Sequence, residues 1–234
     1  MLKTIWRWFK RIFLFAVISS FIYLLLCKWM IPPVTLTQIG NVVDGYSLKR
    51  NCVSWDEISP NAKLAAMASE DQLFPDHTGF DWSAIEKSLK ANPKKKNKIA
   101  GTGASTISQQ TAKNVFLWQG EGFTRYIRKV PEAYFTQLIE WIWGKKRILE
   151  VYLNTIEMGK GIFGIEAAAR QYYHKSAKDL SRNEAATIIA CLPNPKVFTV
   201  KPQSRFVAWK SQWILRQMRN IESDPDVKAL TKPK

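Results

Sequence analysis

A long uncharged run near the N-terminus constrains this chain more than any other feature. Residues 12–27 contain no charged side chain, and Trp29, Met30 and Ile31 continue the apolar stretch beyond Lys28. About 20 helical residues span the hydrocarbon core of a bilayer, and a lysine at its edge can extend its ammonium group to the interface. The sequence therefore predicts a membrane anchor over residues 12–31.

The residues on either side of this run give the anchor a direction. Residues 1–11 carry four basic side chains and no acid, whereas Lys28 is the one charge between the run and Asp44. Because basic flanks stay in the cytoplasm, we expect the N-terminus there and the rest of the chain outside. A cleaved signal peptide is the alternative. It lacks the expected small-x-small pattern, and Leu26 before Cys27 is unlike a lipoprotein cleavage site.

The composition is that of one folded, basic domain behind the anchor. The 234 residues are 46% hydrophobic, yet the mean hydropathy is only -0.20, which together exclude a disordered tail, a collagen-like chain and a polytopic transporter. The net charge is +16. The charge indicates an anionic partner: nucleic acid, an acidic membrane surface or a phosphate-bearing substrate. Export removes nucleic acid from this set. Cys52 and Cys191 either pair outside the cytoplasm or remain buried thiols.

Helical patterns dominate from Ser59 onward, so the predicted fold class is mainly α. Ser59-Pro60 and the capping box at Ser181 mark two helix starts, and no alternating strand block of any length occurs. We expect apolar helix faces formed by Leu138, Trp141 and Ile142, by Leu149, Tyr152 and Leu153, and by Val207, Ile214, Met218 and Ile221. The predicted organisation is a cytoplasmic basic tail (1–11), the anchor (12–31), a connector (32–53), a main domain (54–222) and a loose C-terminal tail (223–234).

The densest chemical constellation lies at residues 69–81, where four acids and His77 gather as a helix gives way to a loop. Glu70 shares a helix face with Met67, so its carboxylate loses hydration and meets the negative end of the helix dipole. Such a group suits a general base or acid. The alternative is that these acids cap the next helix and pair with surface lysines.

Two further stretches look suited to a sugar diphosphate. Residues 101–114 combine small residues with neutral hydroxyl and amide groups, which sugar hydroxyls require, although a polar linker into a helix is the alternative. Arg128 and Lys129 place two cations beside Glu132 at a helix start. Those cations would hold a diphosphate, and Glu132 would contribute to a divalent metal. The run 115–118 either dips into the outer leaflet or is core.

Five motifs in order give the chain a family resemblance. They are ED-x-x-F-x-x-H-x-G-F-D, G-A-S-T-I-S-Q-Q-T-A-K-N, R-K-x-x-E-A, K-K-R-I-L-E-x-Y-L-N, and Glu184-Ala185-Ala186 with Leu192-Pro193-Asn194-Pro195. Their order and spacing resemble those of the family 51 peptidoglycan glycosyltransferases over residues 54–218. The resemblance implies a lysozyme-like helical domain with two lobes and a cleft between them, in a single-pass protein of the bacterial inner membrane whose catalytic domain is periplasmic.

The resemblance also implies the reaction. The lipid-linked growing glycan would be the donor, and the 4-hydroxyl of an incoming lipid II would attack it to form a β-1,4 bond. It implies Glu70 as general base, a surrounding motif shaped by Asp71, Phe74, His77 and Asp81, a donor site lined by Thr106, Gln110, Lys113 and Asn114, a diphosphate contact at Lys113 and Arg128, and Glu132 as a second catalytic residue. Mg²⁺ or Mn²⁺ would bind at Glu132, and no organic cofactor is expected.

Three alternative functions are considered. A lytic enzyme on the same scaffold would need neither a diphosphate site nor an anchor. A non-catalytic anchored scaffold for anionic lipid would explain the charge but not the clustered acids. A bifunctional penicillin-binding protein is excluded, because no Ser-x-x-Lys or Lys-Thr-Gly occurs. Another protein would then crosslink the strands, which makes penicillin-binding and division proteins candidate partners.

Overall fold

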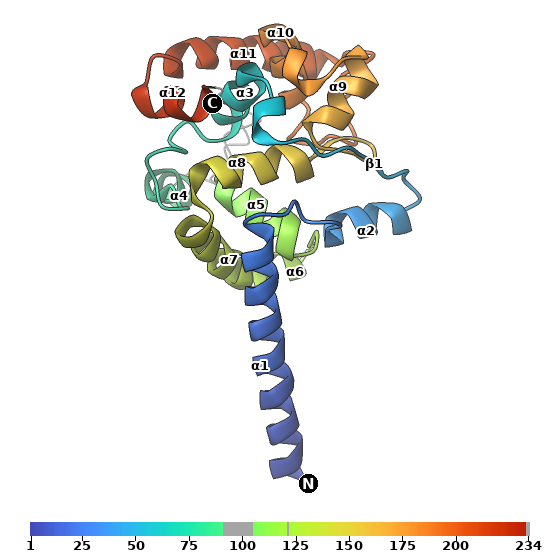
Figure 1. The fold of residues 1–234 in the computed structure, drawn as a ribbon, viewed down its shortest axis with the longest axis vertical. Coiled ribbons are helices and arrows are strands. Elements are labelled where there is room, and N and C mark those ends of the chain that lie inside the picture. The colour runs from blue at the N-terminus through green and yellow to red at the C-terminus, as the bar shows by residue number, and fades with distance from the viewer. Residues whose placement is uncertain (91–104, 121, 233–234) are drawn as a thin grey trace.

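A computed structural model of the chain describes residues 1–90, 105–120 and 122–232. These residues form a mainly helical domain at the end of one long N-terminal helix (Figure 1). The mainly α prediction is confirmed. The small sheet has the order β1-β3-β2, with β1 (Lys49–Arg50) parallel and β2 (Glu157–Gly159) antiparallel to β3 (Ile162–Phe163).

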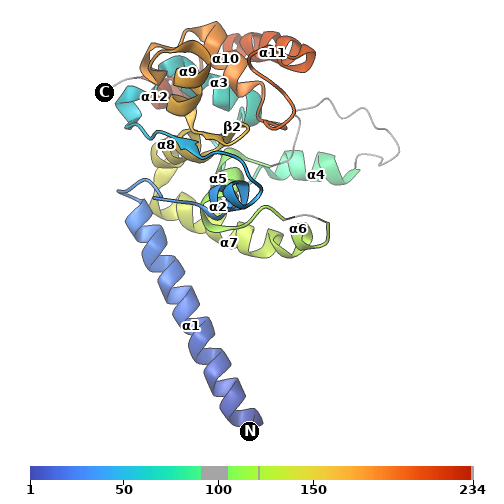
Figure 2. The same ribbon diagram turned by 90° about the vertical axis from the view of Figure 1, so that its right-hand side faces the viewer.

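The domain helices pack as two groups (Figures 1 and 2). The group far from the N-terminus contains α3 (Pro60–Glu70), α9 (Ile165–Tyr173), α10 (Arg182–Ile189), α11 (Arg205–Ile221), α12 (Pro225–Thr231) and the short η1 (Trp55–Glu57) and η2 (Ala177–Asp179). The group beside the long helix contains α5 (Ile107–Phe116), α6 (Thr124–Ile127), α7 (Lys129–Ile142) and α8 (Gly144–Thr155), with α2 (Leu36–Val43) against α5. The helix α4 (Trp82–Lys90) follows the loop after α3.

The helix α1 (Leu2–Cys27) has the length and composition of a membrane span, with a mean hydropathy of 1.9 over its best window. It begins at Leu2, within the stretch predicted as the basic tail, and ends at Cys27, before the predicted limit at Ile31. Leu24 and Cys27 in its last turn are buried in the domain core. Removing α1 would expose this part of the core, which favours an uncleaved anchor over a signal peptide.

Side chains of the domain hold the end of α1 by its backbone. The indole nitrogen of Trp143 donates to Leu24 O at 2.9 Å, and the Arg147 guanidinium donates to Cys27 O at 2.8 and 3.1 Å. The last carbonyls of a helix have no partner within the helix, so these donors cap it. Arg147 also pairs with Glu150 at 2.7 Å, which links the anchor to α8.

The local structure differs from the expectations in three places. The connector contains a helix, α2, which Thr35 and Gln38 start with a capping box. The C-terminal tail forms α12, because Asp224 caps its first amides, Pro225 fits the first turn and Val227 is buried. On α7 the buried face carries Glu132, Phe135, Thr136 and Ile139.

The predicted face of α7 therefore holds only in part. Leu138 and Ile142 are partly buried, whereas Trp141 is 74% exposed. The other predicted faces are confirmed: Leu149, Tyr152 and Leu153 are buried on α8, and Val207, Ile214 and Met218 on α11, with Ile221 partly buried. Val115 and Leu117 are core residues, which decides against the outer leaflet for most of the run 115–118. Cys52 and Cys191 are free thiols.

Candidate active site

The Glu70 carboxylate lies at the last residue of α3, where two neighbours hold it as a hydrogen-bond acceptor. Ser69 Oγ donates to Glu70 Oε1 at 2.8 Å, and Gln110 Nε2 donates to Glu70 Oε2 at 3.2 Å. Gln110 comes from α5, so the carboxylate sits where the two groups of helices meet. Glu70 remains partly exposed, as a group that exchanges a proton with a ligand requires.

A buried tyrosine sets the orientation of the Gln110 amide. Tyr152 on α8 is fully buried, and its hydroxyl donates to Gln110 Oε1 at 3.4 Å. Burial and the nearby Glu70 and Asp71 carboxylates raise the pKa of Tyr152 well above its usual value, so the hydroxyl keeps its proton. With its oxygen occupied, Gln110 presents its NH₂ group to Glu70. The side chain is thus oriented to donate to the Glu70 carboxylate.

Asp71 joins the loop after α3 to the start of α5. Its Oδ2 accepts the backbone N–H of Ile107 at 2.9 Å, and His77 Nε2 donates to the same carboxylate at 2.9 and 3.0 Å. His77 Nδ1 accepts from Gly79 N at 3.0 Å, which places the ring proton on Nε2. Asp71 is 7% exposed and braces the loop, and its contact with substrate stays a prediction.

Other predicted substrate residues also serve to support the loop. Phe74 is buried and meets the His77 ring edge-on. The Thr106 hydroxyl caps α5 by accepting from Gln109 N at 3.1 Å and donates to Gly79 O at 2.7 Å. Gly79 has φ +99°, and a Cβ there would lie 2.9 Å from the Thr136 methyl, so glycine is required.

Asp81 is a helix cap. Its Oδ1 accepts from Ala84 N at 2.8 Å and from Ser83 Oγ at 2.9 Å at the start of α4. The backbone bond from Ala84 is the main reason why the pKa of Asp81 is lowered, and the Ser83 hydroxyl adds to it. The alternative interpretation of the acid cluster as helix caps is therefore correct for Asp81 and not for Glu70.

Arg128 and Glu132 form a buried ion pair at the joint between α6 and α7. They are 6% and 2% exposed, and Arg128 Nε lies 3.4 Å from Glu132 Oε2. Arg128 also donates to Trp118 O at 2.9 Å, and the half-exposed Lys129 ammonium contacts Glu132 Oε1. Arg128 Nε and Glu132 Oε2 make no hydrogen bond to the described residues. The single carboxylate thus holds two cations in place.

Lys113 on α5 lies within electrostatic range of this pair and of Glu70. Burial lowers the pKa of Lys113, the positive Arg128 lowers it further, and Glu132 opposes both effects. No described residue accepts a hydrogen bond from its ammonium group. Beside it, the buried Asn114 Nδ2 also lacks a partner among the described residues. A cation and an amide without partners are suited to an anionic, oxygen-rich ligand.

The side chains of the described residues form no metal centre. Over the described ranges, no three His, Cys, Asp or Glu side chains gather closely enough to hold an ion. Glu132, the predicted metal ligand, is already paired with Arg128 and Lys129. A single paired carboxylate does not fit a resident Mg²⁺ or Mn²⁺ site, which normally uses several oxygen ligands. The predicted metal therefore stays a prediction.

The sequence interpretation missed Lys210, which lies on the buried face of α11. Lys210 is 1% exposed, and its ammonium group lies 3.9 Å from the centre of the Trp213 ring. Burial lowers its pKa and the Glu70 carboxylate opposes this effect, so Glu70 has two lysines within electrostatic range, Lys210 and Lys113. The signal was available: Lys210 stands three residues after Val207 and four before Ile214 in the predicted apolar stripe.

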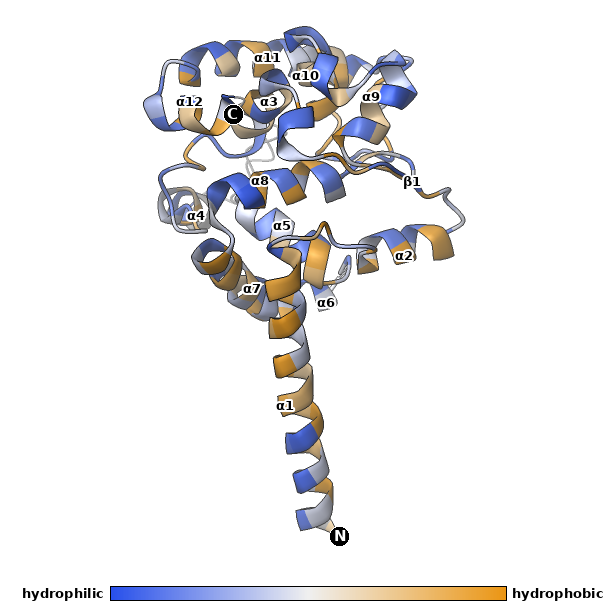
Figure 3. Ribbon diagram, viewed as in Figure 1, coloured by the Kyte–Doolittle hydropathy of each residue, from blue (hydrophilic) through white to orange (hydrophobic). Residues whose placement is uncertain are grey.

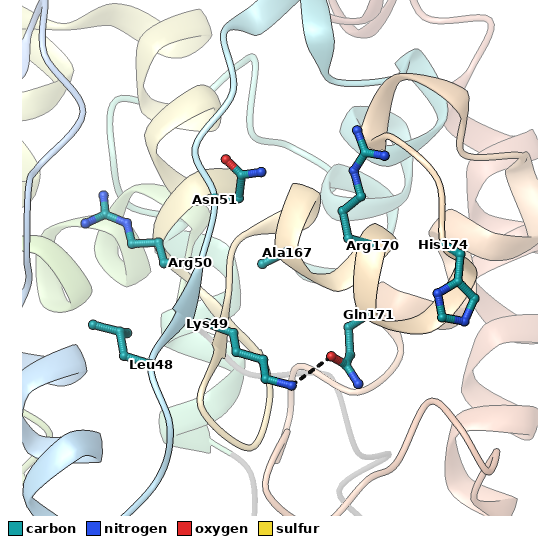
Figure 4. A pocket seen from close by; sticks show the side chains of 8 residues that line it. All are labelled: Leu48, Lys49, Arg50, Asn51, Ala167, Arg170, Gln171 and His174. Carbon is teal, nitrogen blue, oxygen red and sulfur yellow. Dashed lines mark hydrogen bonds between the residues drawn. The ribbon is translucent and has the colours of Figure 1, made fainter.

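A cavity of about 480 Å³ lies elsewhere, between β1 and α9 (Figure 4). None of the candidate active-site residues lines it. Figure 4 shows the Arg50 and His174 side chains directed to opposite sides. Its cations are also engaged, since Lys49 donates to Gln171 and Arg170 pairs with Glu166. The lining residues are Leu48, Lys49, Arg50, Asn51, Ala167, Arg170, Gln171 and His174. The cavity is not the candidate active site.

Comparison with known proteins agrees with this arrangement. Residues 36–219 match the family model described as transglycosylase. The chain belongs to the transglycosylase family. The match covers the transglycosylase alone, in agreement with the missing transpeptidase motifs. It includes both α3 and α5, which carry Glu70 and Lys113, and the α6–α7 joint.

Three relatives extend the likeness to most of the transglycosylase chain. Each is named biosynthetic peptidoglycan transglycosylase. That of Haemophilus influenzae is 45% identical over 95% of this chain and 88% of its own length. That of Pseudomonas fluorescens is 42% identical over 96% and 93%, and that of Escherichia coli is 52% identical over 77% and 72%. The family predicted from the five motifs is confirmed.

The bracing role of Asp71 predicts a loss of stability that needs no substrate. In Asp71→Asn only one acceptor oxygen remains, and the new NH₂ group would oppose either the Ile107 N–H or the His77 Nε2–H, which contacts both carboxylate oxygens in the native chain. The free energy of unfolding should fall by about 1–3 kcal/mol, as when a buried donor loses its partner. Urea unfolding of the full chain in detergent measures this, with Asp76→Asn at an exposed position as control. Unchanged stability together with lost activity would instead show that Asp71 acts on the substrate.

Proposed function

We propose that this transglycosylase polymerises lipid II by transferring the lipid-linked growing glycan to the 4-hydroxyl of an incoming lipid II. One observation carries the proposal. Glu70 is held as a hydrogen-bond acceptor by Ser69 and Gln110, within electrostatic range of Lys113, which in turn lies within range of the buried Arg128–Glu132 pair. A base thus stands opposite a cationic site, and a glycosyl diphosphate donor requires both.

In the proposed reaction Glu70 takes the proton of the acceptor 4-hydroxyl as its oxygen attacks C1 of the donor. The new C1–O4 bond forms while the bond from C1 to the diphosphate oxygen breaks, and the lipid diphosphate leaves with the electron pair. General-base catalysis of this kind contributes about 10²- to 10⁴-fold. Lys113 and Lys210 both lie within electrostatic range of the Glu70 carboxylate.

The diphosphate would bind at Lys113 and Arg128, with Asn114 as a neutral donor. Its negative charge grows as the bond to C1 breaks, and fixed cations in a partly buried site stabilise that charge without reorganising. Glu132 would position Arg128 and Lys129 rather than touch the sugar, because both of its oxygens face cations. Gln110 would hold Glu70, and Thr106 would hold the loop.

The anchor would place this site at a membrane surface. The basic residues of the first 11 positions favour a cytoplasmic N-terminus, which places the domain on the outer face of the bacterial inner membrane. Donor and acceptor both carry lipid tails there. Crosslinking of the product would fall to another protein, and penicillin-binding and division proteins are the proposed partners.

The lytic rival fits the site less well. Glycan hydrolysis normally uses two carboxylates on either side of the scissile bond. Asp71, the carboxylate next to Glu70 in sequence, is engaged with Ile107 N and His77. The scaffold rival leaves the hydrogen-bonded, partly exposed Glu70 without a purpose.

Replacing the proposed base should abolish polymerisation. Glu70→Gln keeps the shape of the side chain but removes its proton affinity, so the rate should fall by about 10²- to 10⁴-fold. The purified full chain is incubated with labelled lipid II, and the glycan strands are separated by gel. Glu86→Gln, at an exposed glutamate on α4, is the matched control. Polymerisation retained by Glu70→Gln would refute the assignment, and shortening of preformed strands would favour the lytic rival.

The lowered pKa of Lys113 predicts a loss of donor use at alkaline pH. As pH rises through this pKa, the ammonium group loses its charge and the diphosphate its partner, so the KM for donor should rise. Lys113→Arg keeps its charge at alkaline pH, so in this variant the KM for donor should rise only at a higher pH. Lys160→Arg, at an exposed position, is the control.

The free energy of unfolding should rise over the same pH range in which donor binding weakens. A loss of donor use is therefore distinguishable from unfolding. The unfolded chain holds the Lys113 proton to higher pH than the folded chain does, so the lysine contributes a stability that increases with pH in this window. If the KM for donor rises at the same alkaline pH in Lys113→Arg as in the unsubstituted chain, Lys113 does not bind the diphosphate.

A further inference from the structure

The helix α2 is amphipathic, but its polar face is buried and its apolar face is exposed. Its polar residues Thr37, Gln38 and Asn41 are buried, at 5%, 0% and 4% exposure. Its apolar residues are exposed, with Leu36, Ile39 and Val42 at 47–50% and Val43 at 80%. A surface helix of a soluble domain normally turns its apolar stripe to the core. The outward stripe on α2 therefore needs an apolar environment outside the protein.

The chain before α2 is held in place, so the direction of the stripe is fixed relative to α1. The Arg50 guanidinium donates to Pro32 O and Pro33 O in the turn between the two helices. Arg147 and Trp143 hold the last turn of α1 itself. Figure 1 shows α2 near the level at which α1 enters the domain, on the side of the domain that faces the anchor.

The neighbouring surfaces point to lipid as the occupant. The candidate span on α1 is 6% buried, so almost all of it is free to meet a bilayer. Around the α6–α7 joint, Phe123, Tyr126 and Val130 are 72–78% exposed. Figure 3 shows apolar residues along the upper part of α1 and on α2. Residues 36–43 carry no charge, whereas Arg125 and Lys129 could meet anionic headgroups.

We infer that α2 lies in the surface of the bilayer, with Leu36, Ile39, Val42 and Val43 inserted among the lipids. This inference rests on the proposed attachment of the chain to a membrane. Such a helix lies in the interface plane with its apolar face at the boundary of headgroups and acyl chains. The occupant is the outer leaflet that also receives α1, not a second copy of the chain.

The buried side of α2 connects this lipid contact to the donor site. Gln119 Nε2 lies 3.3 Å from Thr37 Oγ1 and 3.5 Å from Asn114 Oδ1, so it bridges α2 to the residue that follows Lys113. Asn41 Nδ2 contacts Glu157 Oε2 at 3.4 Å on β2. The helix is therefore a brace that sets the height of the donor site above the lipids.

Quenching of a fluorescent label tests the lipid contact. The probe is NBD on Ile39→Cys in the full chain, in a Cys52→Ser background because Cys27 and Cys191 are buried. The protein is reconstituted into vesicles of phosphatidylethanolamine and phosphatidylglycerol. Doxyl-labelled lipid should quench this label by about twofold or more, and aqueous iodide should quench it weakly. The control is Ala229→Cys, exposed on α12 at the far end of the domain.

Equal lipid quenching at positions 39 and 229 would overturn the inference. So would quenching at position 39 that appears only at high protein density in the vesicles, because a second copy would then cover the stripe. The measurement needs no substrate. If the unsubstituted, unlabelled chain fails to polymerise lipid II, the proposed function fails while the quenching result stands.

A double variant tests the brace. Ile39→Gln with Val43→Gln changes exposed residues that touch no part of the active site. The KM for lipid II in vesicles should rise by about fivefold, whereas the rate with a short-chain donor in solution should stay within about twofold. Trp209→Gln, at a 47% exposed residue on α11, is the control. An unchanged KM in vesicles would refute the brace.

Discussion

The carboxylate of Asp71 is the contact on which the arrangement of the site depends. It accepts a backbone N–H from the first turn of α5 and the Nε2–H of His77, and so joins the end of α3 to the start of α5. The two helices belong to different halves of the domain. Because Glu70 precedes Asp71, the same contact places the proposed base beside Gln110 and on the side of α5 that carries Lys113. The proposed base and the residue that fixes its position are thus neighbours in the chain.

Charge balance decides what the rest of the site can do. Burying a cation is costly unless a counter-charge compensates it. Glu132 serves Arg128 and Lys129 in this way, and Glu70 serves Lys113 and Lys210, but the lysines beside Glu70 form no ion pair with it at contact distance among the described residues. The site therefore has surplus positive charge before substrate arrives. A diphosphate would supply the missing negative charge.

The sequence predicted correctly those elements that depend on capping residues and on apolar periodicity. Capping residues predicted the starts of α3 and α10, the stripe on α11 followed from its periodicity, and the motifs led to the family. Tertiary contacts explain the errors. The inner face of α7 is set by the ion pair of Glu132 with Arg128 and by packing against Phe116, not by its largest side chains. Lys210 was missed because a lysine is rarely buried, and α2 because its polar face is the buried one.

An experimental structure with a bound lipid-linked sugar diphosphate tests the central claim most directly. The account predicts that the diphosphate oxygens lie within hydrogen-bond distance of Lys113 and Arg128, and that an acceptor sugar hydroxyl lies beside Glu70 at about 2.6–3.2 Å. Asp71 should keep both of its protein contacts in that complex. A diphosphate bound in the cavity between β1 and α9, or an Asp71 that leaves Ile107 to bind the sugar, would contradict it.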